Sequence, residues 1–391
     1  MPGSKHWKNL IRNAPGSSMI RKISLLAVLF ISSSAVVAHH GFGRFDPNTE
    51  IQVEGILTNL EFVNPHSYVY FETTDAQGAA LEMGCEMRAA TVLRRSGWSP
   101  ELFVEGAHIV ITGNPHRDDP SSCYVETLAI GEAPTLERYQ QLSEADSSLN
   151  RERALRLPNG EPNISGDWAQ EQYLMAQPKA VGARGVLAPK SMIEGIESGE
   201  IDTSLVPNSG WGARPVTLTE AGQAAAEVLR RQAPEDNPRM RCEITSILFD
   251  WVFDGPINRI TQEEDLIIME YGRDLTRNIT MGGAQASGFV ASRGGYSTGR
   301  WEGDTLVVET TGFLEGRLAG NIPHSNRLHI TERFTLDTDT MALQRDYIAE
   351  DALYFEDQYS GSDTVLLADA PFAVDQCKEL AYEYTTGLGE E

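Results

Sequence analysis

The sequence predicts a mainly β protein that contains a small barrel, a larger antiparallel up-and-down barrel and few helices. Short segments with alternating or β-branched apolar residues recur along the chain, and Gly, Pro, Asn or Asp separate them. The stretch 296–313 is a clear case, because Gly303-Asp304 supplies a hairpin turn and places Trp301 opposite Leu306. A length of 391 residues is typical of two domains.

Residues 1–38 have the pattern of a secretory signal peptide. A basic pair precedes the apolar run 23–31, which is too short to span a bilayer, and small residues at 36–38 offer a cleavage site. Cleavage there would make His39 the first residue of a periplasmic or secreted protein that has no membrane segment. The alternative is an uncleaved membrane anchor.

The chain is acidic, with a formal net charge of −24. A surface of this kind repels nucleic acid and anionic lipids, and it favours solubility, cations or basic partners. We therefore expect no nucleic-acid partner.

Four cysteines fit an oxidising compartment. Three pairings are possible, and we favour Cys85–Cys123 with Cys242–Cys377 because these two bridges need no contact between the halves of the chain. Four buried free thiols are the alternative. A zinc site fits less well, since no two cysteines are close in sequence.

Residues 39–133 form the first predicted domain, a small OB-like barrel. A short helix is expected at 87–96, where Gly97 ends it, and Gly55 allows a bend in the first strand. Five or six short strands with one helix are typical of such a barrel. The expected strands are 51–57, 66–72, 80–83, 108–112 and 123–129.

Four motifs in this half resemble a family of uncharacterised secreted bacterial proteins, known as a domain of unknown function. The resemblance covers roughly residues 38–140 and implies no established activity. The motifs are His39-His40-Gly-Phe, Asn64-Pro65-His66, Leu93-Arg-Arg-Ser-Gly-Trp98 and Cys123-Tyr-Val-Glu-Thr-Leu128.

Residues 134–162 are predicted to be a charged linker that is compatible with a helix over 136–157. The second domain, 163–391, opens with Gly166-Asp-Trp168, and a long loop rich in Gly, Pro and Ser follows at 178–216. A capping box at 217–220 then starts a helix.

Seven or more sequential strands follow Cys242, and closing them as a barrel would remove their exposed edges. This half resembles a second group of uncharacterised secreted bacterial proteins over about residues 163–385. The shape also suggests a lipocalin-like barrel, whose first strand would carry Gly166-Asp-Trp168. The motifs shared with the second group are Gly299–Val308, His324-Ser325 and Glu332-Arg-Phe334.

His39, His40 and His66 are candidate metal ligands. A terminal amine, its own imidazole and one further histidine form a nitrogen-rich set that suits copper(II). His66 follows the Asn64-Pro65 turn, which could return it to the mature N-terminus. The alternative is a disordered or packing role for these histidines.

Polar and aromatic residues on the later strands could line the mouth of the second barrel and bind a small molecule. Packing in the core and at the rim is the alternative. His324 and Ser325 are not a catalytic pair, because neighbours on a strand point to opposite faces. The candidate residues are Tyr271, Tyr296, Trp301, His324 and Arg333.

The hairpin 328–349 predicts a buried ion pair. If the chain turns at Thr338-Asp339, Glu332 lies opposite Arg345 on the otherwise apolar face. Two charges there are costly unless they meet, so we expect a salt bridge. The pair either neutralises itself or contacts a polar group of a ligand.

These features favour an exported protein that binds a small, largely apolar molecule in the second barrel. The alternatives are a periplasmic hydrolase or isomerase that uses the polar groups of that barrel, and a copper-binding protein. The residues identify no ligand, no substrate and no oligomeric state.

Overall fold

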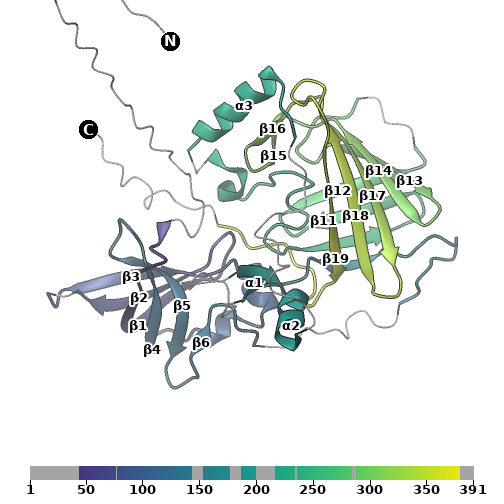
Figure 1. Ribbon diagram of the computed structural model, residues 1–391. Helices are drawn as coiled ribbons and strands as arrows, with labels where there is room; N and C mark the ends of the chain where they lie inside the picture. The colour runs from purple at the N-terminus through teal and green to yellow at the C-terminus, as the bar shows by residue number, and fades with distance from the viewer. Residues whose placement is uncertain are drawn as a thin grey trace, which may run out of the picture. The chain divides into compact units, whose positions relative to one another are not determined.

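The computed structural model is mainly β and contains two closed barrels, as predicted (Figure 1). Both barrels belong to one unit, His39–Glu391. The predicted signal peptide, His39 and His40 lie outside the described residues. No helix in the described part of the chain is long and apolar enough to cross a membrane. The structure describes residues 44–75, 77–142, 153–176, 186–199, 216–233, 236–283 and 288–378.

The small barrel has the connectivity of an OB fold, which confirms the prediction. Its strands are ordered β3-β2-β1-β4-β5, a parallel pairing between β3 and β5 closes it, and helix α1 (Ala90–Arg95) joins β3 to β4. The strands are β1 (Ile51–Glu61), β2 (Tyr68–Thr74), β3 (Ala80–Glu86), β4 (His108–Pro115) and β5 (Ser122–Ile130).

Side chains alternate across the wall of the small barrel. On β2, Val69 and Phe71 are buried in the core, whereas the rings of Tyr68 and Tyr70 stack on the outer face. The predicted disulfide Cys85–Cys123 is present and lies at the closing pair of strands, where the two cysteines are direct partners.

The first part of the predicted helical linker is not a helix. Residues Leu136–Glu137 form strand β6, which pairs with β5. The chain then packs on the small barrel, because Trp98 Nε1 donates to Gln140 O and Leu142 N donates to Ser96 O. Leu136 contributes to the apolar core, and this burial outweighs the helix-compatible composition.

The large barrel has nine strands in the order β10-β11-β12-β13-β14-β17-β18-β19-β7. The predicted first strand, with Gly166-Asp-Trp168, is β7, and it closes the barrel by pairing with β10 and β19. The strands are β7 (Gly166–Ala169), β10 (Ile257–Gln262), β11 (Leu266–Tyr271), β12 (Leu275–Met281), β13 (Tyr296–Glu302), β14 (Thr305–Thr311), β17 (His329–Asp337), β18 (Ala342–Glu350) and β19 (Tyr359–Leu367).

The central hairpin has the predicted register. Trp301 pairs with Leu306 across the turn, and Gly303 adopts the positive φ of 64° that the turn requires. The neighbouring pair β12–β13 is parallel, however, so the barrel is not antiparallel throughout. A long connection between these strands lets the chain cross back before β13 begins.

Three segments around the large barrel differ from expectation or add to it. The predicted loop 178–216 contains strand β9 (Val186–Pro189), which pairs with β8 (Tyr173–Ala176), and helix α2 (Lys190–Ser198). Helix α3 (Glu220–Arg231) is capped by Thr219, whose hydroxyl accepts from Gly222 N, and not by Thr217. A ribbon of β15 (Gly316–Ala319) and β16 (Ile322–His324) separates β14 from β17.

A segment that follows Cys242 fills the interior of the large barrel. Ile247, Leu248 and Trp251 join the core cluster that the inward faces of the strands form. The Trp251 ring contacts Tyr271 and Phe334, with ring centroids 5.5 and 5.9 Å apart.

Candidate functional site

The predicted ion pair in the large barrel is present. Arg345 Nη1 lies 3.1 Å from Glu332 Oε1, and both side chains are fully buried. Arg277 Nη2 binds the other oxygen of Glu332 at 2.6 Å, and Arg345 Nη2 binds Asp363 at 2.6 Å.

The register of this hairpin differs from the prediction by two residues. Glu332 pairs with Tyr347, and Phe334 pairs with Arg345. The turn is longer than expected, because Asp337 pairs with Ala342 and the four residues between them form the loop. An even shift keeps every side chain on its face, so the ion pair survives as a diagonal contact.

Tyr271 belongs to the same buried network. Its hydroxyl donates to Ile247 O and accepts from Arg277 Nη1, and burial raises its pKa. Arg345 also donates to the carbonyls of Ile247 and Leu248. The polar groups predicted to contact a ligand therefore bind one another and the segment that fills the barrel.

The other predicted ligand residues do not join this network. His324 is buried with Nδ1 3.2 Å from Ser325 O, and burial lowers its pKa. Tyr296 stacks on a phenylalanine, Trp301 is half-buried, and Arg333 is exposed in an ion pair with Glu302. Ser325 donates its hydroxyl to Asp351.

His66 lies against the buried carboxylate of Glu86. His66 Nδ1 is 2.7 Å from Glu86 Oε1, and the Tyr68 hydroxyl donates to Glu86 Oε2 at 3.1 Å. Burial opposes the charged form of His66, but the Glu86 carboxylate outweighs it and raises the pKa of the imidazole. Burial and the same carboxylate also raise the pKa of Tyr68.

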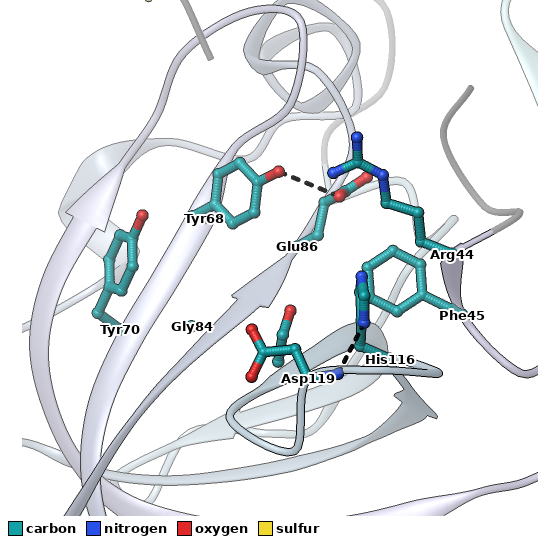
Figure 2. A pocket seen from close by; sticks show the side chains of 9 residues that line it. Arg44, Phe45, Tyr68, Tyr70, Gly84, Glu86, His116 and Asp119 are labelled. Carbon is teal, nitrogen blue, oxygen red and sulfur yellow. Dashed lines mark hydrogen bonds between the residues drawn. The ribbon is translucent and has the colours of Figure 1, made fainter. Parts of the chain in front are cut away.

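A small pocket of about 30 Å³ adjoins Glu86 on the outer face of β2 and β3. Figure 2 shows the Tyr68 hydroxyl directed at the Glu86 carboxylate and the His116 ring beside that of Phe45. His116 Nδ1 accepts from two backbone amides, and burial lowers its pKa, so the ring is neutral. Gly84 keeps the pocket open, because a Cβ there would lie 2.9 Å from the Tyr70 ring.

Within the described residues, no three His, Cys, Asp or Glu side chains form a cluster that could hold a metal ion. His39 and His40 lie outside those residues, so the predicted copper site stays a prediction.

A larger cleft of about 190 Å³ lies between α1, the segment 170–173 and the turn 253–255. Val92 and Phe253 contribute apolar surface, whereas Arg88, Gln170 and Tyr173 contribute polar groups.

Arg95 holds the walls of the cleft together. Its guanidinium donates to the Gln170 carbonyl at 2.7 Å, to the Gly255 carbonyl at 3.0 Å and to the Asp369 carboxylate at 2.8 Å. Gly255 has a φ of 58°, and a Cβ there would lie 2.8 Å from the guanidinium of Arg95. These contacts fix the shape of the cleft.

Sequence reasoning missed this cleft. The helix at 87–96 and its Val92 were predicted, but Arg88 carries no local signal that distinguishes it from a surface arginine. The contact between Arg95 and Asp369 joins residues 274 positions apart, and no periodic pattern predicts it.

Two closed barrels, two disulfides and a cleft held by Arg95 define the class: a disulfide-bonded, two-barrel β protein. Residues 27–123 match a family described as "Family of unknown function (DUF6152)". This match agrees with the resemblance of the first half of the chain. No curated protein and no solved structure matches the chain. The resemblance of residues 163–385 to a second family stays a prediction.

Proposed function

We propose that this is an exported protein that binds a small, largely apolar molecule in the cleft beside α1. The observation that carries the proposal is the cleft itself, with about 190 Å³ between Val92 and Phe253 and a few polar groups around them. An apolar cavity of about 150 Å³ holds benzene, so a ligand with a single ring fits. The signal pattern in 1–38 and the two disulfides support export.

We place the ligand in the cleft rather than inside the large barrel. Ile247, Leu248 and Trp251 occupy the interior of that barrel, and Arg345 is fully engaged there. A ligand in the barrel would have to displace them, whereas the cleft needs no such change.

Calorimetric titration with benzamide, a neutral single-ring probe, tests the proposal. The parent protein should bind benzamide saturably, and Val92→Trp should abolish binding because the larger ring fills the cleft. Val104→Trp is the matched control, since Val104 is 60% exposed and does not line the cleft. The proposal would be contradicted if the parent protein bound neither benzamide nor benzoate.

Copper binding at the mature N-terminus is a second candidate. His66 presents Nδ1 to the Glu86 carboxylate, and histidines that bind metals commonly use one nitrogen in this way. If His39 is the first residue, His66→Ala and an added N-terminal residue should each weaken copper binding by orders of magnitude. The exposed-site control His329→Ala should not. Equal uptake by all four forms would contradict this candidate.

Export has its own measurement. Mass spectrometry of the protein purified from the periplasm should find His39 at the N-terminus. An intact 23–31 segment in that material would show that the signal peptide is not removed.

A further inference from the structure

Arg88 stands at the edge of the cleft, two residues before α1. Its Nη2 donates to the Tyr173 carbonyl at 3.3 Å, and its guanidinium lies 4.7 Å from the centre of the Tyr139 ring. Its Nη1 is buried and has no hydrogen-bond partner among the described residues. Among the described residues, no carboxylate oxygen lies within 4.0 Å of the Arg88 guanidinium.

Arg88 is half-buried, and most of the fully buried arginines in the described part of the chain have carboxylate partners; Arg317, which binds only carbonyl and amide oxygens, is the exception. Arg95 binds Asp369, Arg277 binds Glu332, and Arg345 binds two acids. A buried guanidinium without a counter-charge is costly, because water no longer solvates it. Arg88 therefore differs from these three arginines in having no carboxylate within ion-pair distance, although the charge of Asp254 acts on it from farther away.

The two acids that line the cleft are engaged elsewhere. Asp254 forms ion pairs with Arg239 and Arg273. Both oxygens of Glu171 accept from Ser191, one from the backbone amide and one from the hydroxyl. Neither acid forms a close ion pair with Arg88, and the charge of Asp254 is shared with two other arginines.

We infer that the ligand of this cleft carries an anionic group, that this group binds Arg88, and that its apolar body lies against Val92 and Phe253. The inference rests on the proposed function and names the ligand class, a single-ring or short-chain monocarboxylate. Arg88 lines the cleft, and its planar guanidinium can match a carboxylate with two parallel hydrogen bonds.

Paired titrations of the mature protein with benzoate and benzamide test the inference, because the two probes have the same ring and differ in charge. Benzoate should bind about tenfold tighter or more, as expected for charge-assisted hydrogen bonds. Arg88→Met should remove this preference and leave benzamide binding unchanged. Arg230→Met, an exposed arginine on α3, is the control and should behave as the parent.

The outcomes separate the inference from the proposed function. Equal affinity for the two probes in the parent, or a benzoate preference that persists in Arg88→Met, would overturn the inference alone. Binding of neither probe would overturn both.

Melting temperatures measured with and without benzoate distinguish a binding role of Arg88 from a purely structural one. Without ligand, Arg88→Met should melt within about 3 °C of the parent, because only one long hydrogen bond and one contact with the Tyr139 ring are lost. Benzoate should raise the melting temperature of the parent but not of the variant. If the methionine variant does not fold, Arg88→Lys keeps the charge, loses the planar fork, and should bind benzoate more weakly than the parent. A lysine variant with the parent's affinity would overturn the inference.

Discussion

Glu332 and Arg345 meet across β17 and β18 as a fully buried ion pair whose members are not direct partners in the register. Arg345 shares its charge with Asp363, and Glu332 shares its charge with Arg277. The four side chains form one alternating chain of charges in the barrel. Removal of Glu332 would leave Arg277 without a carboxylate, and removal of Arg345 would leave Asp363 without a cation.

Arg345→Met should destabilise the protein by about 3–5 kcal/mol, because it leaves Glu332 and Asp363 short of a cation in a buried site. Arg333→Met is the matched control on the adjoining strand: its exposed pair with Glu302 should be worth less than about 1 kcal/mol. Urea denaturation of both variants measures the difference. Equal losses would show that burial of the pair has no energetic role.

The two disulfides should contribute unequally to stability. In the chain-entropy treatment, the bridge Cys85–Cys123, with a sequence separation of 38, is worth about 4 kcal/mol. The bridge Cys242–Cys377, with a separation of 135, is worth about 5 kcal/mol. Unfolding of the two double-serine variants measures the order, and non-reducing peptide maps check the pairing. A larger loss from the shorter loop would contradict the prediction.

The contribution of His66 to stability should fall as the pH rises above about 6.5. Its pKa is raised in the folded state, so its contribution is complete below about 6.5, the ordinary value, and is lost as the pH rises through the folded-state pKa. Glu86→Gln removes the raising carboxylate and should flatten the decline in melting temperature. Glu350→Gln, beside the more exposed His329, is the control. Parallel profiles for the parent and Glu86→Gln would refute this assignment.

Gly222 of α3 should resist replacement by alanine, although alanine is the better helix former by about 1 kcal/mol. A Cβ at this position would lie 2.2 Å from the carbonyl oxygen of Tyr354. We expect Gly222→Ala to destabilise the protein by about 1–3 kcal/mol, as overpacking does. Ala224→Gly, exposed on the same helix, should cost about 1 kcal/mol through propensity alone. A stabilising Gly222→Ala would show that helix α3 packs less closely.

Local patterns predicted the hairpins, because strand alternation and turn chemistry act over a few residues. The 296–313 hairpin was correct in register since Gly303 supplies the positive φ of the predicted two-residue turn. The register of the 328–349 hairpin was predicted two residues away from the observed one. Met341 adopts a positive φ of 54° in the longer turn, and methionine is not a residue type from which this conformation is expected. The faces remained correct because the shift was even.

Long-range packing was not predictable in the same way. The segment with Ile247, Leu248 and Trp251 has an ordinary apolar composition. Its place in the interior depends on the closed barrel around it, which the local sequence does not indicate. Glu332 and Arg345 were correctly assigned to the buried face, whereas Tyr271, which was predicted at the mouth of the barrel, is buried inside it. The segment with Ile247 and Leu248 accepts hydrogen bonds from Tyr271 and Arg345. The cleft could not be predicted from local patterns, because its walls come from three separate regions of the chain.

The segment 369–377 makes the shape of the cleft depend on a distant part of the chain. All five strands of the small barrel and both of its cysteines lie between residues 51 and 130, so this barrel can close without that segment. Asp369 anchors Arg95, and Cys377 pairs with the backbone of Asn64. A small barrel that closes before the segment docks would therefore lack the contact that holds one wall of the cleft in place.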